Sequence, residues 1–488
     1  MASRTRSGAS PETPPETLPD RVRILVVGAG FAGLGAAIKL DEAGHRDFLV
    51  IDKGDSVGGT WRDNTYPGAA CDVPSQLYSF SFAPNPTWSR SFSPQPEIKA
   101  YLEDVARRSG VLDRFRFGVA VEDAAWDEQD NVWHVGTSAG TVTADIVISG
   151  SGGLSEPKLP EIEGIGDFRG EIFHSARWDH DYDLTGKRVA VIGTGASAIQ
   201  IVPEIAEKVA HLDVYQRTAP WVIPRNDRPY TGVERFAFRH LPLVQKAYRT
   251  AIYWGRELYV PAFTLEPRLA APAKAAALAN IRKGISDPAL RKAVTPHYQI
   301  GCKRILISNT YYPALDRDDV ELVTDRIAEV TPTGIRTADG TEREIDCLVV
   351  ATGFYTTDQP IAHHIKGRDG RTLADVWAEH GMASYKGTTT AGFPNLFQIV
   401  GANTGLGHSS MVFVIESQIA YILSAIEQMD RRGITAVEPR QEVQDAWNAD
   451  LHRRMGRTVW STGGCASWYL DEHGRNTTLW PRTTVAFR

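Results

Sequence analysis

Two stretches of the chain decide its fold: RILVVGAGFAG at residues 23–33 and RVAVIGTGASA at residues 188–198. Each begins with a short apolar run, which predicts a buried strand, and continues into a glycine-rich loop. A helical pattern and a second apolar run follow each loop. The predicted elements are strands at 21–28 and 48–51 around a helix at 31–43, and strands at 187–193 and 212–215 around a helix at 196–209. Each stretch therefore opens a β-α-β unit, the setting in which such a loop binds the phosphates of a dinucleotide.

Glycines stand at the positions of these loops that such binding requires. The first loop carries Gly28, Gly30 and Gly33, and the second carries Gly193 and Gly195. Glycine lets the backbone approach a pyrophosphate, and the N-terminus of the following helix supplies a favourable dipole. One such loop is weak evidence, but two, each placed between a strand and a helix, make a chance match improbable.

The two units carry opposite charges at one shared position. Asp52 lies 24 residues after Gly28, and Arg217 lies 24 residues after Gly193. An acid at the end of the second strand accepts hydrogen bonds from ribose hydroxyls, whereas an arginine there suits the 2′-phosphate of NADP. The sequence therefore predicts FAD in the first unit and NADPH in the second, with electrons passing between them.

Composition sets broad limits on the class of protein. The chain has 488 residues, 42% hydrophobic and 23% charged, as in an ordinary globular protein of two or three domains. Its net charge of −6, without a basic block, argues against nucleic acid as a partner. No apolar run is expected to reach the length of a membrane span. The first twenty residues are rich in Pro, Ser, Thr and Glu, which predicts a disordered tail on a cytoplasmic protein.

The expected fold is α/β, with two Rossmann-type dinucleotide-binding domains, the second inserted in the first, plus a helical insertion. Apolar strands at 145–149 and 346–350 end in small residues and are the expected crossings between domains. A long helix is expected at 411–432. The predicted boundaries are a tail at 1–20, an FAD-binding domain at 21–153 and 351–488 with the C-terminal segment, an NADP-binding domain at 154–230 and 294–350, and the helical insertion at 231–293.

Several other residues invite interpretation. Four aromatic side chains of the insertion could line a substrate tunnel, touch a membrane surface or simply pack helices, and packing is the favoured reading: Tyr248, Tyr253, Trp254 and Tyr259. The four cysteines, Cys71, Cys302, Cys347 and Cys465, contain no Cys-x-x-Cys pair, so inert thiols are expected, with neither a redox dithiol nor a zinc site. His363 and His364 are adjacent and do not share a helical face for a metal. Ser197 and Ser409 lack the context of a nucleophile elbow.

A longer pattern lies between the two loops. Phe168, Gly170, His174, Trp178 and Asp179 match FxGxxxHxxxW followed by Pro or Asp. This resembles the signature of type I Baeyer–Villiger monooxygenases, of the class B flavoprotein monooxygenase family. A second family pattern is GGTWRDNTYPGAACD at residues 58–72, and the resemblance continues through CKR at 302–304, ATGF at 351–354 and SWY at 467–469.

The resemblance implies roles for individual residues. The implied FAD contacts are Asp52, Trp61, Asp72, Tyr78, Val121 and Met411. The implied NADP site is formed by Gly193, Thr194, Gly195, Ala196, Ser197, Ala198, Arg217, Thr218 and Lys303. Ala70, Cys71, Asp72 and Trp468 are expected near the nicotinamide, and His174 and Trp178 are expected to couple domain movement to catalysis. Arg304 is implied to be the essential active-site arginine.

The implied reaction uses NADPH, FAD and O₂ to insert one oxygen beside a ketone carbonyl through a peroxyflavin, giving an ester or lactone, and possible sulfoxidation. Arg304 suits it on chemical grounds, because a permanent planar cation stabilises an anionic peroxide and the anionic adduct. Asp72 could orient the guanidinium through a bidentate pair. The alternatives are a phosphate-binding or surface role for Arg304 and a turn-stabilising role for Asp72.

Other functions stay open at this point: an N- or S-oxidising flavin monooxygenase, a flavin-dependent NADPH oxidase or reductase, and a nucleotide-binding sensor. His408, in GLGHSS before the long helix, is expected near the flavin. This stretch departs from the family members that act on cyclic ketones, so the choice among cyclic, aryl and long-chain ketones is left open, as is the oligomeric state.

Overall fold

The computed structural model describes residues 17–488. Most of the predicted tail, residues 1–16, lies outside this range. The last residues of that predicted tail belong to the folded part, because Leu18 packs against a hydrophobic cluster and Asp20 O accepts a hydrogen bond from Thr143 N. Residues 18 and 20 are therefore part of the fold, although the composition predicted a tail up to residue 20.

The first sheet is built around the strand that precedes the first glycine loop. Its strand order is β17-β4-β5-β6-β1-β2-β3, and β18 also pairs with β6. Strand β1 pairs in parallel with both β2 and β6, while β4, β5 and β6 form an antiparallel meander. The strands are β1 (Arg21–Val27), β2 (Phe48–Asp52), β3 (Phe115–Phe117), β4 (Val121–Asp127), β5 (Val132–Thr137), β6 (Gly140–Ser149), β17 (Ile365–Lys366) and β18 (Leu396–Gln398).

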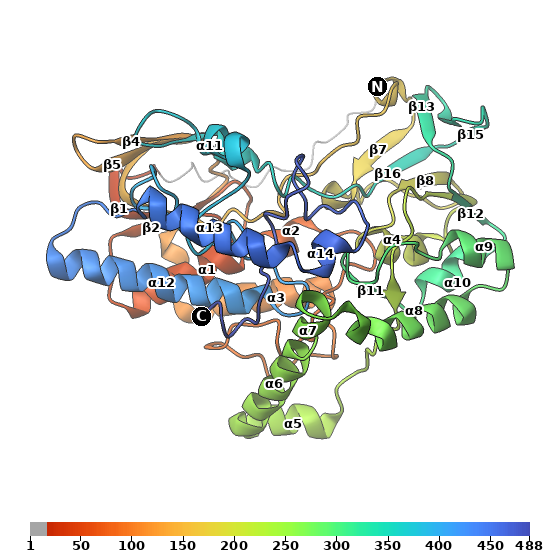
Figure 1. Cartoon of the computed structure of the whole chain (residues 1–488), viewed down its shortest axis with the longest axis horizontal. Helices are drawn as coiled ribbons and strands as arrows, with labels where there is room; N and C mark the ends of the chain where they lie inside the picture. Colours follow the sequence, from red (N-terminus) through yellow and green to blue (C-terminus); the bar gives the residue numbers. More distant parts are fainter. Residues whose placement is uncertain (1–16) are drawn as a thin grey trace, which may run out of the picture.

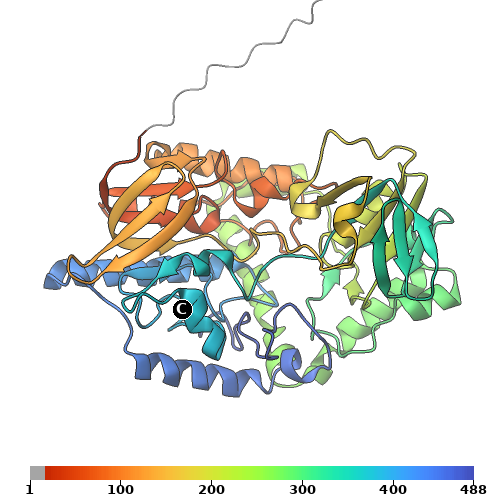
Figure 2. The same cartoon turned by 90° about the horizontal axis from the view of Figure 1, so that it is seen from above.

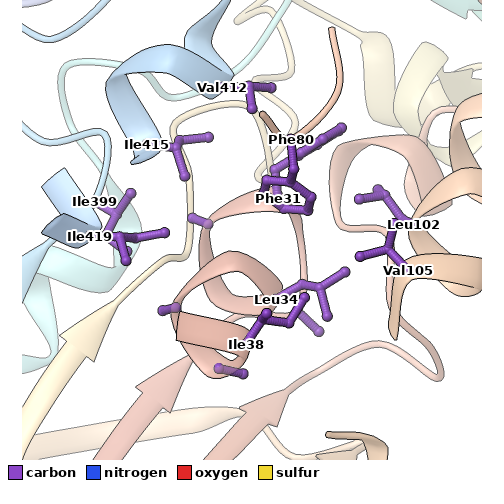
Figure 3. Packing of buried hydrophobic residues seen from close by; sticks show 14 of the residues in the cluster. Phe31, Leu34, Ile38, Phe80, Leu102, Val105, Ile399, Val412, Ile415 and Ile419 are labelled. Carbon is purple, nitrogen blue, oxygen red and sulfur yellow. The ribbon is translucent and has the colours of Figure 1, made fainter. Parts of the chain in front are cut away.

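Three helices cover one face of this sheet: α1 (Phe31–Glu42), α3 (Gln95–Ser109) and α12 (Met411–Arg432). Figure 3 shows Phe31, Leu34 and Ile38 of α1 between Leu102 of α3 and Ile419 of α12, with every side chain buried. Figure 1 places α1 against α12, although the two helices lie far apart in the sequence. Figure 2 shows the orange strands of the first sheet and the teal strands of the second unit at opposite ends of the molecule. The predicted helix at 411–432 is confirmed at both ends.

Helix α12 is long and apolar enough to cross a membrane by length and composition, with a mean hydropathy of 1.2. This differs from the expectation that no apolar run reaches the length of a membrane span. The packing explains the composition, because Val412, Ile415, Ile422 and Ile426 lie buried in the same cluster as α1. The apolar length of α12 is that of a core helix.

The second sheet is parallel throughout, in the order β12-β9-β8-β16-β7. Its strands are β7 (Glu171–His174), β8 (Arg188–Ile192), β9 (His211–Tyr215), β12 (Val320–Val323) and β16 (Cys347–Val350). A small antiparallel sheet of β13 (Ile327–Thr331), β14 (Gly334–Thr337) and β15 (Glu342–Glu344) lies beside it. The chain leaves the first sheet after β6 and returns to it with β17, so the expected α/β fold with two Rossmann-type units, the second inserted in the first, is confirmed.

Helix α4 (Ala198–Ile205) follows the second glycine loop and is shorter than the predicted 196–209. Pro203 lies inside it, and proline removes one backbone donor and disfavours continuation of a helix. Its buried face, including Ile199, Ile201 and Val202, packs in the cluster of the second sheet.

The insertion is helical, as predicted, and its elements are α5 (Gly232–His240), α6 (Pro242–Glu257), α7 (Val260–Thr264), η4 (Pro267–Ala270), α8 (Ala271–Gly284) and α9 (Pro288–Ala293). Figure 1 shows α5 and α6 projecting from the body of the molecule. A capping box between Thr231 and Glu234 starts α5. Ile281 of α8 packs in the second cluster, whereas Phe238 of α5 packs in the first, so the insertion contacts both units.

The aromatic residues of the insertion divide into two pairs. Tyr248 and Tyr253 are half-buried and pack against the first cluster, as the favoured reading predicted. Trp254 and Tyr259 are 55% and 53% exposed, so helix packing does not explain them. The remaining short elements are α2 (Thr60–Asp63), η1 (Leu112–Arg114), η2 (Ile165–Asp167), η3 (Ser175–Arg177), β10 (Val222–Ile223), β11 (Leu306–Ile307), α10 (Tyr311–Leu315), η5 (Pro360–His363), α11 (Leu373–His380), α13 (Gln441–Met455) and α14 (Val459–Thr462).

Candidate active site

The first glycine loop is packed too closely for side chains. Gly28 has φ +104°, and a Cβ there would lie 2.6 Å from Gly150 O. A Cβ on Gly33 would lie only 1.7 Å from Gly28 O, and a Cβ on Gly59 would lie 2.9 Å from the Cα of Gly30. The bare backbone at the start of α1 is therefore a cradle that any side chain would fill, which is the geometry a pyrophosphate needs.

Asp52 ends β2 and is almost fully buried. Its Oδ2 accepts a 2.6 Å hydrogen bond from Ala29 N, and its Oδ1 accepts from Gly54 N at 2.7 Å and from Arg62 Nη1 at 2.8 Å. A carboxylate offers about four acceptor sites, so about one is left for a ribose hydroxyl. Arg62, a partner that the sequence analysis did not foresee, holds the carboxylate in place.

The other implied FAD contacts lie on several elements of the first unit. Trp61 Nε1 donates to Tyr78 Oη at 3.0 Å, and the two rings pack edge to face. Burial raises the pKa of Tyr78, so its hydroxyl stays protonated. Val121 begins β4, close to the point where Val119 N donates to Asp52 O. Met411 is the first residue of α12 and is half-buried.

The second glycine loop is more open than the first. Gly193 has φ +120°, and a Cβ there would lie 2.4 Å from Ala351 O, but a Cβ on Gly195 would meet nothing within 4 Å. Thr194 Oγ1 donates to Thr218 O at 3.1 Å, which ties the loop to the end of β9. Of the other predicted positions, Ala196 is exposed, Ser197 precedes α4 and Ala198 is buried at its first position. The loop thus keeps a surface open to a ligand.

Two cations stand beside this loop without acidic partners. Arg217 is exposed just after β9, and Lys303 is half-buried with its Nζ 5.3 Å from the ring centre of Tyr298. Burial lowers the pKa of Lys303, and the charge of Arg217 lowers it further, so the two cations are close. Neither forms an ion pair with any residue from 17 to 488. Such a pair is suited to a phosphate group.

Asp72 and Arg304 meet between the two units. Arg304 Nε donates to Asp72 Oδ2 at 2.8 Å, and its Nη2 donates to Asp72 Oδ1 at 2.7 Å. The side chains keep 31% and 23% exposure, so the pair remains accessible. Burial would raise the pKa of Asp72, but the guanidinium outweighs this and holds that pKa below its ordinary value, while Asp72 raises the pKa of Arg304. The expected bidentate pair is present, and both groups are ionised.

Other side chains converge on this pair. Tyr469 is buried beside Arg304, and burial raises the pKa of its hydroxyl to about 12. Its neighbour Trp468 is 46% exposed and lies 4.4 Å from it between ring centres. Cys71 is a buried free thiol whose pKa is raised by burial. The C-terminal segment therefore reaches the predicted centre.

Gln200 and Arg256, which no sequence pattern predicted, also lie near the Asp72–Arg304 pair. Gln200 of α4 accepts from Ala70 N at 3.3 Å and donates to Ala70 O at 3.0 Å, and Tyr66 Oη donates to the same Gln200 Oε1 at 3.0 Å. This joins the second unit to the YPGAACD loop of the first. Arg256 of α6 lies near enough to Asp72 and Arg304 to feel both charges, although burial is the main cause that lowers its pKa. No pattern in the sequence marks an arginine on a helix of the insertion.

The long signature forms the edge of the second sheet. His174 ends β7 and is 4% exposed, and burial lowers its pKa to about 4. Its ring lies edge to face against Phe354, where the chain leaves β16. Trp178 packs edge to face on Phe173, and a Cβ on Gly170 would lie 2.5 Å from Asp346 O. The signature thus fixes the segment through which the chain returns towards the first sheet.

One expectation needs correction. Cys302 and Cys465 form a disulfide, whereas inert thiols were expected. The pairing was invisible in the sequence because 163 residues separate the two cysteines. The bond fixes the segment before Trp468 next to Lys303 and Arg304. The other two cysteines, Cys71 and Cys347, are buried free thiols, as expected.

His408, for which a place near the flavin stays a prediction, contacts the insertion. Its Nε2 lies 3.1 Å from Glu257 Oε1 at the end of α6, and the side chains are 2% and 5% exposed. Thr484 Oγ1 donates to the same Glu257 oxygen at 2.7 Å. This buried junction fixes the end of α6, next to Arg256, against the C-terminal segment.

The chain was compared with known proteins. The family model described as "Pyridine nucleotide-disulphide oxidoreductase" matches residues 25–235. A Baeyer–Villiger monooxygenase of Streptomyces coelicolor is 53% identical over 97% of the chain and 91% of its own length. The structure of OTEMO in complex with FAD and NADP has a TM-score of 0.87 at 30% identity, with 96% of each chain covered. That of cyclohexanone monooxygenase bound to ε-caprolactone has a TM-score of 0.83 at 30% identity, again with 96% of each chain covered.

Proposed function

The chain belongs to the Baeyer–Villiger monooxygenases, and from this premise we propose that its Arg304–Asp72 pair directs the family reaction at the junction of the two units. The enzyme oxidises ketones to esters or lactones with NADPH, O₂ and FAD. The chemistry supplied by the bound cofactors is hydride transfer from NADPH to FAD and activation of O₂ by the reduced flavin. The protein provides binding, orientation and charge.

The residues of the first unit fit FAD. Bare glycine backbone at Gly28, Gly30 and Gly33 faces the N-terminus of α1, and Asp52 keeps an acceptor for a ribose hydroxyl. Trp61 and Tyr78 pack next to Phe31 at the start of α1, and we propose Val121 and Met411 as further contacts of FAD. We propose residues 21–153 with 351–488 as the FAD-binding domain.

The residues of the second unit fit NADPH. The loop from Gly193 to Ala198 is open at Gly195, and the cations of Arg217 and Lys303 have no acidic partner in the described chain. A 2′-phosphate would supply the missing charge, and Thr218 stands beside it. We propose residues 154–230 with 294–350 as the NADP-binding domain, interrupted by the insertion at 231–293.

Arg304 stabilises the negative charge that develops on the ketone oxygen when the carbonyl is attacked. Its guanidinium keeps its charge at any pH at which the enzyme folds, because Asp72 raises its pKa further. Asp72 holds the planar group through Nε and Nη2, and the buried Tyr469 hydroxyl lies against the same guanidinium. The bidentate pair is the single observation that carries this proposal, since it positions the cation before the substrate arrives.

The remaining parts of the proposal concern partners and location. We propose a small-molecule ketone and O₂ as the reacting partners, with no nucleic acid, and a cytoplasmic enzyme. The net charge of −6 and the core packing of α12 support this. A disulfide-reductase role is disfavoured because the sequence contains no Cys-x-x-Cys pair.

The test is the variant Arg304→Ala, assayed with a ketone and with a thioether. Loss of one charge-stabilising donor should reduce ketone oxygenation roughly 10²- to 10³-fold, measured as product heavier by one oxygen atom. Bleaching of the flavin by NADPH should persist, and sulfoxidation should fall less, because sulfur attacks a neutral peroxide. Arg304→Lys keeps the positive charge but cannot bind Asp72 through two nitrogens. Its rate of ketone oxygenation should therefore lie between those of the unaltered enzyme and Arg304→Ala. Equal loss of flavin reduction and ketone oxygenation would remove Arg304 from the oxygenation step.

A further inference from the structure

The exposed hydrophobic side chains of the molecule are concentrated on the insertion. Ten of the sixteen large hydrophobic residues that are exposed within residues 17–488 lie between positions 233 and 269. We call these ten the insertion surface: Val233, Phe236, Leu241, Leu243, Val244, Trp254, Leu258, Tyr259, Leu265 and Leu269. A patch of this kind on one projecting part of a protein indicates a partner, because isolated exposed apolar residues are normally scattered.

Helix α6 shows that the pattern is built into the sequence. Its outward stripe is apolar and runs from Leu243 through Ala247 and Ala251 to Trp254, with Leu258 just past the helix end. The spacing of four, four, three and four residues follows one face of a helix. Leu243 and Leu258 are each 79% exposed.

The inward face of α6 combines polar side chains with Tyr248, Ile252 and Tyr253, which pack against the first cluster. Gln245 Nε2 donates to Gln76 Oε1 at 2.8 Å, and Arg249 Nη2 donates to Ser79 O at 2.9 Å. Glu257 is held by His408 and Thr484. A helix that faces water has the opposite arrangement, with its polar side outward. The outer face of α6 is therefore suited to an apolar environment.

The charge of the insertion selects among possible partners. The exposed charged residues between 231 and 275 are almost all basic, with Glu266 as the exposed acid: Arg235, Arg239, Lys246, Arg268 and Lys274. The whole chain nevertheless carries a net charge of −6. Two copies of this surface would bring like charges together, which disfavours self-association. An anionic lipid surface attracts the cations and accepts the apolar side chains between them.

We propose that the insertion surface docks peripherally on a bilayer that contains anionic phospholipid. Trp254 and Tyr259 are amphipathic rings of the kind that lie at the headgroup level. Figure 1 shows that α5 and α6 project from the body, so they can reach a membrane without displacing either sheet. Docking in this manner needs no spanning helix, and it leaves α12 in the core.

The test measures binding of the flavin-loaded enzyme to vesicles by flotation. Vesicles of phosphatidylcholine with phosphatidylserine should bind the enzyme, vesicles of phosphatidylcholine alone should bind it much less, and high salt should release it. Leu243→Glu should weaken binding roughly tenfold or more, because it removes a leucine that would insert into the bilayer and adds an anion. Lys246→Ala should weaken it about fivefold, the effect of one cation near the surface.

Leu159→Glu is the matched control, because Leu159 is 57% exposed but lies outside the insertion. It should bind like the unaltered enzyme, and the flavin content of all variants should be unchanged. Binding that ignores lipid charge, or equal weakening by Leu159→Glu and Leu243→Glu, would overturn the proposal. So would a dimer without lipid that Leu243→Glu dissociates, since a second copy would then be the partner. If Leu243→Glu fails to fold, the comparison of the two vesicle types with the unaltered enzyme decides.

Discussion

The two glycine loops start from the same β-α-β pattern but are built differently. The first loop is tightly packed, because the backbones of Gly28 and Gly33 lie in close contact and the Asp52 carboxylate already accepts three hydrogen bonds. The second has Ala198 where the first has Gly33, leaves Gly195 in open space, and exposes Arg217. A preorganised, enclosed loop suits a cofactor that stays, and an open loop with unpaired cations suits one that enters and leaves.

We expect the largest effect from replacing Gly33 of the first loop by alanine, the residue that the second loop has at the equivalent position 198. Gly33→Ala places a methyl group 1.7 Å from Gly28 O, where the backbone itself must move. Overpacking of this kind costs at least about 1–3 kcal/mol of stability. The strain lies in the backbone of the first glycine loop, which would bind the pyrophosphate of FAD. Purified Gly33→Ala should therefore contain at least about tenfold less flavin per chain, measured by absorbance.

The reverse change serves as the control. Ala198→Gly should keep its flavin and cost about 1 kcal/mol of helix stability, since the second loop already accepts a methyl group there. If Gly33→Ala binds flavin normally, the tight packing of the first loop is not what holds the cofactor.

A further prediction concerns the folding stability of the second unit in acid. His174 is buried with a pKa of about 4, below the ordinary 6.5 of histidine. Above pH 6.5 the imidazole is neutral in both the folded and the unfolded chain, so the stability is complete. As the pH falls towards 4, only the unfolded chain takes up the proton, and stability is lost by up to about 3 kcal/mol.

His174→Gln should remove this part of the acid sensitivity, measured as the difference in unfolding midpoint between neutral and acidic buffer. His363→Gln provides the control, because His363 is exposed and pairs with Asp358. An unchanged acid sensitivity in His174→Gln would show that other groups govern it.

Arg217 tests the open character of the second loop. A charge-assisted hydrogen bond contributes about 1.5–3 kcal/mol, so Arg217→Ala should reduce the preference for NADPH over NADH by roughly 10- to 150-fold. The ratio of kcat/KM for the two coenzymes measures this. Arg317→Ala, a surface arginine paired with Asp319, should leave the ratio unchanged. If the unaltered enzyme uses both coenzymes equally well, Arg217 does not read the phosphate.

Gln200 joins the two units and should have the smallest effect. Its side chain makes two hydrogen bonds to the backbone of Ala70, each contributing about 0.5–1.5 kcal/mol. Only part of this energy falls on the geometry of the reacting groups, so Gln200→Ala should raise KM for NADPH or lower kcat by about fivefold to tenfold, while flavin content stays normal. A complete loss of activity would mean that Gln200 touches the reacting groups.

Local patterns predicted most of the fold. The paired strands and the helix at 411–432 follow from apolar periodicity, and the equal 24-residue offsets to Asp52 and Arg217 identify equivalent strand ends. Arg304 and Asp72 could be paired from the resemblance and the chemistry of the reaction. Long-range contacts could not be predicted in this manner. The disulfide of Cys302 with Cys465 and the approach of Arg256 to Asp72 depend on how the insertion and the C-terminal segment fold over the junction.

The outward face of α6 is a further limit of pattern reading. Helix packing was the favoured reading for four aromatic residues of the insertion. Tyr248 and Tyr253 do pack inward, whereas Trp254 and Tyr259 are exposed. Gln245, Arg249 and Glu257 form hydrogen bonds with the body of the molecule, so the opposite side of α6 faces outward.

The most direct test of the account is a single desalting experiment on enzyme first saturated with FAD and NADP⁺. We expect the protein fraction to remain yellow, with one flavin per chain, and the NADP⁺ to appear in the small-molecule fraction. A colourless protein that does not take up added FAD, or release of the two nucleotides at the same rate, would contradict the assignment of a resident cofactor to the closed loop and an exchangeable one to the open loop.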